Sequence, residues 1–353
     1  MAGPWILRVF AIHISLHVFG GIVSCYERKV PTYTVDLDAP ASDRWNEVVD
    51  DFQREIGMIA KAVREFVPVQ WHSAFNQLTT KDFFPRPFGE ELKGIAERAQ
   101  VPHVDMLMVN LLYTLRAYGC TSIVAQSSTG KIWHGRNLDY GVSTYEKELI
   151  TKLAIQVNFR KNGKIVYTGT SYAGYVGLPN GQRHGAFSIS LNERAQGDVM
   201  ENILMLRERA IPVPMLIRQV LSSPLNYRQA LKTLSTTRIS APAYLTVGGI
   251  LPGEGAVITR NHRKAVNVWE LDMTINRWFV LETNYDHWKP PPLYDDRRTP
   301  GNKAMNDIGQ KGFNGTSMLQ VLSTAPILNP LTTFTAIMSA VDPIEYYTVV
   351  LQP

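Results

Sequence analysis

Apolar positions divide the chain into a helical first third and a strand-rich remainder. Between residues 42 and 63 they recur every three or four positions, which predicts an amphipathic helix. Pro68 is expected to prevent this helix from continuing. The same spacing predicts helices over residues 89–99 and 105–115, so residues 33–118 are interpreted as helical throughout.

From residue 120 onward the pattern changes to short β-branched and alternating apolar runs, which predict strands. One hairpin is marked by Asn162-Gly163, a dipeptide suited to a tight turn between strands. Strands with helices grouped between them are typical of α+β layers, in which helices pack on stacked antiparallel sheets. Predicted strands occupy residues 121–126, 131–137, 153–159, 165–168, 187–191, 243–247, 256–259, 266–271 and 278–283, and predicted helices occupy residues 200–209, 214–221, 227–234 and 316–322.

The beginning of the chain has the features of a secretory signal peptide. Arg8 is followed by an apolar run over residues 9–23 and by small residues around Ser24. A membrane-spanning anchor is the alternative, but it needs about 20 uninterrupted apolar residues. Because His13 and His17 interrupt the run, cleavage near residue 25 and entry into the secretory route are predicted.

Composition and charge favour a globular enzyme that works at an anionic surface. An apolar content of 45% over 353 residues is enough for a large core and excludes a disordered chain. The net charge of +5 favours anionic partners, but no basic run or aromatic–basic motif for nucleic acid occurs. An anionic membrane or micelle surface is therefore the predicted partner, and nucleic acid is not. The sequon at Asn314 predicts a glycosylated surface loop.

Aromatic residues and prolines are concentrated in residues 71–88, after the first predicted helix. Trp71 and Phe84 are the predicted membrane contacts of this segment, because aromatic side chains bury area while tolerating water at one end. The alternative is that these aromatic residues pack the N-terminal segment onto the rest of the protein.

Cys120 is the residue whose setting points most directly to chemistry. The chain has one other cysteine, Cys25, which cleavage of the signal peptide can remove. Cys120 stands where a helical pattern ends and a strand pattern begins, with Arg136 and Asp139 downstream. This setting suggests that the chain cuts itself between Gly119 and Cys120, and that the freed α-amino group serves as a general base. A buried structural thiol is the alternative.

Six short motifs occur in order over nearly the whole chain. They are Cys120-Thr-Ser-Ile-Val-Ala, His134-Gly-Arg-Asn-Leu-Asp-Tyr, Gly174-Tyr-Val-Gly, Asn192-Glu-Arg, Thr283-Asn-Tyr-Asp-His-Trp-Lys and Asp295-Asp-Arg-Arg. Together they resemble the family of N-acylethanolamine-hydrolysing acid amidases and acid ceramidases. The resemblance implies the N-terminal-nucleophile (Ntn) hydrolase fold, an α+β fold of four αββα layers preceded by a helical α subunit. It also implies a lysosomal enzyme that is made as one precursor and works as a heterodimer of α and β chains.

This resemblance divides the chain into a signal peptide (residues 1–25), a helical α subunit (26–119) and a catalytic β subunit (120–353). It implies that the substrate is a fatty acyl amide lipid, an N-acylethanolamine hydrolysed to a fatty acid and ethanolamine. Ceramide hydrolysis is the alternative. The motif Tyr285-Asp-His-Trp-Lys-Pro resembles the acid amidases, whereas Ala241-Pro-Ala-Tyr resembles the ceramidases. The extra cysteines of the ceramidase pattern are missing, which favours the amidase.

The resemblance also implies roles for six residues. Cys120 is the nucleophile, Arg136 favours its thiolate, and Asp139 holds the new α-ammonium group. Asn284 donates to the oxyanion that forms during amide hydrolysis. Glu193 is a candidate for acid-dependent self-cleavage, because a buried carboxyl group titrates at a raised pH. Arg297 matches a family site position and is a candidate brace of the site.

Two rival interpretations remain at this point. A Cys–His dyad with His134 as the base is one, although histidine is largely protonated at acidic pH. A secreted lipid-binding protein with an inactive Ntn fold is the non-enzymatic alternative. The retention of Cys120, Arg136, Asp139 and Asn284 argues against the second. No cofactor is expected, and the histidines and cysteines lack the spacing of a metal site.

Overall fold

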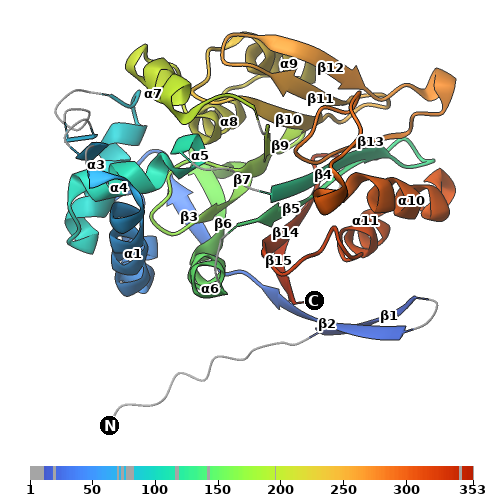
Figure 1. Ribbon diagram of the computed structural model, residues 1–353, viewed down its shortest axis with the longest axis horizontal. Coiled ribbons are helices and arrows are strands. Elements are labelled where there is room, and N and C mark those ends of the chain that lie inside the picture. Colours follow the sequence, from blue (N-terminus) through green and yellow to red (C-terminus); the bar gives the residue numbers. More distant parts are fainter. Residues whose placement is uncertain are drawn as a thin grey trace.

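Two stacked β-sheets form the centre of the molecule (Figure 1). The computed structural model describes residues 12–18, 21–69, 71–72, 75–76, 83–115, 119–140, 144–194, 196–341 and 344–352. Within them, the first sheet has the order β1 (Ile12–Val18), β2 (Gly21–Lys29), β15 (Glu345–Gln352), β14 (Thr332–Ser339), β5 (Ile132–Asp139), β4 (Gly119–Gln126) and β13 (Phe279–Glu282). The second has the order β12 (Ala265–Glu270), β11 (Gly255–Arg260), β10 (Ala243–Gly248), β9 (Phe187–Glu193), β8 (Asn180–Arg183), β7 (Lys164–Tyr172), β6 (Ala154–Lys161) and β3 (Thr32–Asp36).

Helices cover the outer faces of both sheets and complete four layers. On the first sheet, α11 (Gly315–Leu322) packs against β5 and β14, and α10 (Arg298–Ile308) packs beside it against β13. On the second sheet, α8 (Val213–Ser222) packs against β8 and β9, and α9 (Tyr227–Thr236) packs against β10 and β11. This arrangement confirms the predicted αββα fold.

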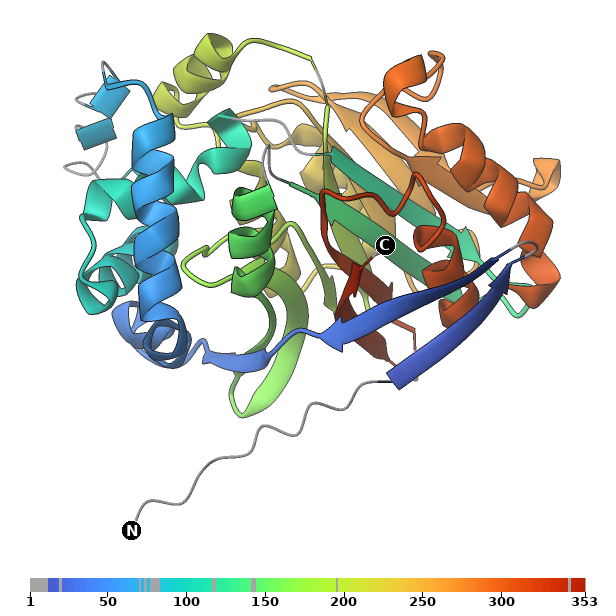
Figure 2. The ribbon, with the colours of Figure 1, turned by 60° about the horizontal axis from the view of Figure 1, so that its bottom comes forward.

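The N-terminal segment forms a helical group at the end of the sandwich where β3 lies (Figure 2). It contains α1 (Asn46–Phe66), α3 (Phe88–Ala99), α4 (His103–Asn110) and the short α5 (Leu112–Leu115). Two further helices, α6 (Thr144–Leu153) and α7 (Val199–Arg207), belong to the second part of the chain. The predicted apolar stripe of α1 is buried, through Val48, Val49, Ile56, Ile59, Ala60 and Val63.

The turn predicted at Asn162-Gly163 agrees with the structure, but the interpretation of residues 33–118 as wholly helical is wrong at its start. Asn162 and Gly163 join β6 to β7 with φ values of 49° and 75°, as a tight hairpin turn between strands requires. In β3, Tyr33 and Val35 are buried while Thr32 and Thr34 are exposed, which is the alternation of a strand. The strand pairs in parallel with β6 and thereby joins the N-terminal segment to the second sheet.

The sequence pattern does not predict the last two strands, β14 and β15. In β14, all eight residues are buried, so no alternation of apolar and polar positions marks it. Its threonines are buried because they have partners: Thr333 Oγ1 donates to the Leu138 carbonyl at 2.9 Å, and Thr335 Oγ1 donates to Asn137 Oδ1 at 2.8 Å. Segments 144–153, 180–183 and 298–308 are likewise regular elements that the pattern does not predict.

The predicted signal peptide overlaps β1 and the beginning of β2. The residues of β2 that pair with β15 are Tyr26 to Lys29, which follow the predicted cleavage position. Cleavage near residue 25 would therefore leave this pairing in place. Among the helices that the structure describes, none is both long and apolar enough to cross a membrane.

A buried ion pair joins the N-terminal helices to the rest of the fold. Glu91 in α3 and Arg218 in α8 are 0% and 2% exposed. Arg218 Nη2 donates to Glu91 Oε1 at 2.8 Å, Nη1 bonds to Oε2, and Trp45 Nε1 donates to Oε2 at 2.9 Å. The guanidinium also lies 4.7 Å from the ring centre of Phe159. Because both charged groups are buried, removal of either one would leave the other without a counter-ion and destabilise the fold.

We expect Glu91→Ala to lower the free energy of unfolding of the single chain by about 3–5 kcal/mol, because it leaves the Arg218 guanidinium buried without its counter-ion. Glu97→Ala is the control on the same helix: this exposed carboxylate pairs with Lys93 at 3.7 Å, and its loss is expected to cost under about 1 kcal/mol. Urea denaturation measures both values. Equal losses for the two variants would contradict a stabilising role for the pair.

Candidate active site

Cys120 lies buried at the start of β4, and a guanidinium contacts its sulfur. In the register of β4 and β5, Cys120 faces Leu138 and Ser122 faces Arg136, so Cys120 and Arg136 share one face of the sheet. Arg136 Nη2 is 3.1 Å from Cys120 Sγ, and Nη1 donates to the Pro179 carbonyl at 2.9 Å. The predicted meeting of Arg136 with the thiol is therefore found in the structure.

Asn284, which follows β13, binds the backbone nitrogen of Cys120. That nitrogen donates to Asn284 Oδ1 at 2.9 Å, and Arg297 Nη2 donates to the same oxygen at 2.7 Å. The amide group Nδ2 of Asn284 donates to the Glu193 carbonyl at 2.8 Å. In the uncut chain, Asn284 therefore acts on the nitrogen that cleavage would turn into an α-amino group.

Arg297 connects the backbone of Cys120 to three carboxylate and amide groups. Its Nη1 donates to the Cys120 carbonyl at 2.5 Å and lies 3.4 Å from Asp139 Oδ2. Asp295 holds the guanidinium in a two-point ion pair, with Nε–Oδ1 at 2.7 Å and Nη2–Oδ2 at 2.8 Å. Arg297 is thus fixed in place by Asp295, and its role as a brace of the site stays a prediction.

Asp139 approaches the cleavage position from the face of the sheet opposite to the sulfur. It pairs with Gly119 in the strand register, and a Cβ atom built on Gly119 would lie 3.2 Å from Asp139 Oδ2. Thr332 Oγ1 donates to Oδ1 at 2.7 Å, and Asn329 Nδ2 donates to Oδ2 at 2.9 Å. A side chain at position 119 would therefore require Asp139 to shift by a few tenths of an ångström. Thr332 and Asn329 were missed because the pattern predicts no element near them.

Burial sets the protonation of the site. Burial raises the pKa of the Cys120 thiol, while the charges of Arg136 and Arg297 oppose that shift. Burial also raises the pKa of Asp139, against Arg297 and the hydrogen bonds from Thr332 and Asn329. The carboxyl group of Glu193 has its pKa raised by burial from 4.5 to about 7. The Glu193 carboxyl group therefore holds its proton to a higher pH than an ordinary glutamate does, and its role in acid-dependent self-cleavage stays a prediction.

His134 occupies a different position between the sheets. It faces Val124 in the register, whereas Cys120 faces Leu138 four residues further along the strand. Its ring nitrogens hydrogen-bond to Ser188 Oγ at 2.9 Å and Ser190 Oγ at 2.7 Å. Burial lowers the pKa of the imidazole to about 3, so the ring is neutral but does not reach the thiol. This geometry rules out the Cys–His dyad in the uncut chain.

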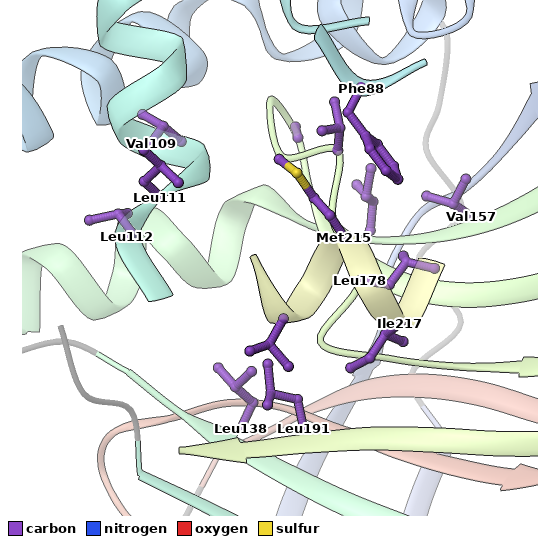
Figure 3. Packing of buried hydrophobic residues seen from close by; sticks show 14 of the residues in the cluster. Phe88, Val109, Leu111, Leu112, Leu138, Val157, Leu178, Leu191, Met215 and Ile217 are labelled. Carbon is purple, nitrogen blue, oxygen red and sulfur yellow. The ribbon is translucent and has the colours of Figure 1, made fainter. Parts of the chain in front are cut away.

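An apolar pocket opens beside Cys120 and is shared by both parts of the chain. Figure 3 shows Val109 and Leu112 on the N-terminal helices and Leu138 and Leu191 on strands of the two sheets. A pocket lined by apolar side chains suits a hydrocarbon chain. A chain bound there would have the carbon atom at its end beside the Cys120 thiol. Its walls are formed by Ile59, Val109, Leu112, Cys120, Leu138, Tyr140, Ile150, Leu153, Tyr172, Ala173, Tyr175, Pro179, Leu191 and Pro214.

Two predicted surface features have different outcomes. Phe84 is only 6% exposed and belongs to the main core, so its predicted contact with lipid is wrong: packing of the N-terminal segment buries it. Trp71 is half-buried and packs against the same core. Asn314 is exposed and caps α11 by accepting a hydrogen bond from the Ser317 nitrogen at 3.1 Å. Its glycosylation stays a prediction.

Comparison with known proteins identifies relatives over nearly the whole chain. Residues 120–321 match a family model described as linear amide C–N hydrolases, choloylglycine hydrolase family. Residues 28–90 match a model described as the beta subunit of N-acylethanolamine-hydrolyzing acid amidase. The sequence analysis names this N-terminal segment the α subunit, so the two names differ for the same part of the chain.

Individual relatives include both enzymes named in the sequence analysis. The N-acylethanolamine-hydrolyzing acid amidase of Cavia porcellus is 41% identical, with 90% of each chain covered. The acid ceramidase of Homo sapiens is 36% identical and covers 89% of this chain and 84% of its own. A solved structure of the Caenorhabditis elegans ortholog of the acid amidase is 42% identical, has a TM-score of 0.57, and covers 63% of this chain and 93% of its own.

We expect the stability contributed by Glu193 to decrease as pH rises between about 4.5 and 7. The pKa of Glu193 is higher in the folded chain than in the unfolded chain, so the folded state binds the extra proton in this window. Ionisation at higher pH places a charge in a partly buried site. Glu193→Gln is never charged. The difference in free energy of unfolding, parent minus variant, should therefore fall by about 1–3 kcal/mol from pH 5 to pH 8.

Urea denaturation at the two pH values measures this difference. Glu97→Gln, a change at an exposed carboxylate of α3, serves as the control and should follow the parent at both values. Parallel pH curves for the parent and Glu193→Gln would show that the carboxyl group does not titrate in this range.

Proposed function

We propose, from the premise that this chain belongs to the choloylglycine hydrolase family of linear amide C–N hydrolases, that its substrates are N-acylethanolamines. The products are a fatty acid and ethanolamine. The observation that carries this proposal is the position of Cys120. It lies at the wall of an apolar pocket, with a guanidinium on its sulfur and an amide oxygen on its nitrogen.

The proposed first reaction is self-cleavage between Gly119 and Cys120. The Cys120 sulfur adds to the Gly119 carbonyl carbon, the C–N bond breaks, and the nitrogen takes up a proton. Water then hydrolyses the resulting thioester, which releases the Gly119 carboxylate and restores the thiol. The hydrogen bond from Arg297 to the Cys120 carbonyl and the strand pairing of Gly119 with Asp139 support this proposal, because both hold the junction in place.

The proposed second reaction is amide hydrolysis by the new N-terminus. The α-amino group, in its uncharged form, accepts the thiol proton, and the thiolate attacks the amide carbonyl carbon. The amine leaves as ethanolamine after taking up that proton, and water cleaves the acyl thioester to the fatty acid. Arg136 favours the thiolate, Asp139 and the Asn284 oxygen hold the ammonium form, and the Asn284 amide group serves the oxyanion.

An N-acylethanolamine is favoured over ceramide as the substrate. The apolar pocket accounts for an acyl chain, which both substrates carry. The cysteines that the sequence analysis associates with ceramidases are missing, and identity is higher to the acid amidase of Cavia porcellus than to the acid ceramidase of Homo sapiens. Ceramide remains the second candidate.

The same proposal places the enzyme in an acidic compartment of the secretory route, the lysosome, as a heterodimer of two chains from one precursor. The raised pKa of Glu193 supports an acidic working range. For contact with an anionic membrane or micelle, we favour the end of α1, where Phe66 and Val69 are 48% and 76% exposed near Trp71. Glycosylation at the exposed Asn314 would accompany this route.

Turnover assays with two substrates test the function. The acid-treated protein is expected to hydrolyse N-palmitoylethanolamine with a higher kcat/KM than ceramide at acidic pH, and to carry a free N-terminus at Cys120 by intact-mass analysis. Cys120→Ala should stay a single chain and hydrolyse neither, because it lacks the attacking sulfur. Faster turnover of ceramide would make ceramide the favoured substrate. A fully active chain in which Gly119 is still bonded to Cys120 would refute the N-terminal-nucleophile mechanism.

Two substitutions at Asn284 separate its donor role from its acceptor role. Asn284→Ala removes both and is expected to lower kcat for the amide by about a hundredfold or more. Asn284→Asp keeps an oxygen for the Cys120 nitrogen and Arg297 but loses the amide donor. If the oxyanion needs that donor, both variants should be equally slow in single-turnover assays on chains that are fully cleaved. A near-normal rate for Asn284→Asp would assign the oxyanion role elsewhere.

A further inference from the structure

A short loop between β7 and β8 forms part of the wall of the apolar pocket. We call residues 173–179 the pocket loop. Ala173, Tyr175 and Pro179 of this loop line the pocket together with Cys120. The position of the loop therefore decides the shape of the space beside the thiol.

The N-terminal segment holds this loop through one buried side chain, Asn110, the last residue of α4. Asn110 is 1% exposed. Its Nδ2 donates to the Gly174 carbonyl at 2.9 Å, and its Oδ1 accepts from the Val176 nitrogen at 2.9 Å. A single amide thus satisfies two backbone groups of the loop, which would otherwise be buried without partners. Val109 and Leu112, close to Asn110 in sequence, line the same pocket (Figure 3).

A second anchor from the N-terminal segment acts through the buried ion pair. Arg218 Nη1 donates to the Val176 carbonyl at 2.9 Å, and Glu91 of α3 fixes that guanidinium. Ser171 adds bonds from within the same part of the chain, to the carbonyls of Tyr175 at 3.0 Å and Gly177 at 2.8 Å. The loop is therefore tied at several points. Its bonds to Asn110 and the bond between Arg218 and Glu91 cross the proposed cleavage junction.

The far end of the loop is connected to the thiol. The Pro179 carbonyl accepts from Arg136 Nη1 at 2.9 Å, and Nη2 of the same residue is 3.1 Å from Cys120 Sγ. The loop also fits closely against the N-terminal helices. Gly174 has a φ of +86°, and a Cβ atom built there would lie 3.2 Å from Met106 Cε and 3.4 Å from Ile56 Cγ1.

We propose that Asn110 is a positioning residue that fixes the pocket loop and thereby sets the preference of the site for long acyl chains. This inference rests on the proposed function. It means that the N-terminal chain remains part of the substrate site after cleavage, because the pocket wall depends on its amide side chain.

Two substitutions disturb the contact from opposite sides. Asn110→Leu removes both hydrogen bonds at similar volume, and Gly174→Ala introduces a side chain at positive φ against Met106 and Ile56. Asn202→Ala is the matched control. It removes another bond across the junction, from Asn202 Nδ2 to the Thr114 carbonyl at 3.0 Å, without touching the loop.

The first readout is the ratio of kcat/KM for N-palmitoylethanolamine to that for a short-chain homologue, measured on fully cleaved protein. We expect this ratio to fall about tenfold in Asn110→Leu and in Gly174→Ala, and to stay at the parental value in Asn202→Ala. A variant that is merely less stable would lose active protein for both substrates alike, so its ratio would not change.

The second readout does not need the proposed substrate. N-octylmaleimide and N-ethylmaleimide alkylate thiols by the same reaction and differ in tail length, so their relative rates on Cys120 report how well the pocket accepts a chain. We expect the parent to favour the octyl reagent and both loop variants to lose that preference.

The outcomes separate the two proposals. If the parent hydrolyses no N-acylethanolamine but the octyl preference falls in both loop variants, the proposed substrate is wrong and the role of Asn110 stands. If both loop variants keep the parental ratios in cleaved, folded protein, the positioning role is overturned whatever the substrate. Loss of the preference in Asn202→Ala as well would also overturn it, since any contact across the junction would then have the same effect.

Discussion

A fully buried guanidinium, that of Arg136, is the constraint on which the site depends. A charge out of water needs fixed partners, and Arg136 finds them in the Cys120 sulfur and the Pro179 carbonyl. The strand register brings Arg136 to the same sheet face as the thiol, and stacking of the second sheet excludes water from that face. The fold therefore places a positive charge beside sulfur at a position where burial alone would keep the thiol protonated.

The two faces of the first sheet divide the groups around Cys120. On the face toward the second sheet lie the sulfur and Arg136, beside the apolar pocket. On the other face, Asp139 and Arg297 surround the junction with Gly119, and Arg297 reaches it from the start of α10. Groups that act on the sulfur are thus separated from groups that act on the peptide bond. A single residue at the start of one strand can serve both of the proposed reactions for this reason.

The sequence itself singles out Cys120 at the change from a helical to a strand pattern, with Arg136 and Asp139 downstream. The roles of Arg136 and Asp139, and the choice of Asn284, Glu193 and Arg297, come only from the family resemblance, since these residues lie far apart in the chain. Thr332 and Asn329, which hold Asp139, were not predicted, because β14 is buried at every position and carries no alternating pattern. The predicted lipid contact of Phe84 was wrong because a cluster of aromatic residues does not distinguish a surface position from a core position. In the structure Phe84 is buried in the core.

The N-terminal segment contributes to the pocket wall, through Ile59, Val109 and Leu112. It adds β3 to the edge of the second sheet, and it contributes Glu91 to a buried ion pair with Arg218. If it left after cleavage, Arg218 would lose its counter-ion and the carbonyl of Gly174 would lose its donor, both in the interior. These costs oppose dissociation of the two chains. A cut at Gly119 can therefore free the nitrogen of Cys120 while the wall of the pocket stays in place.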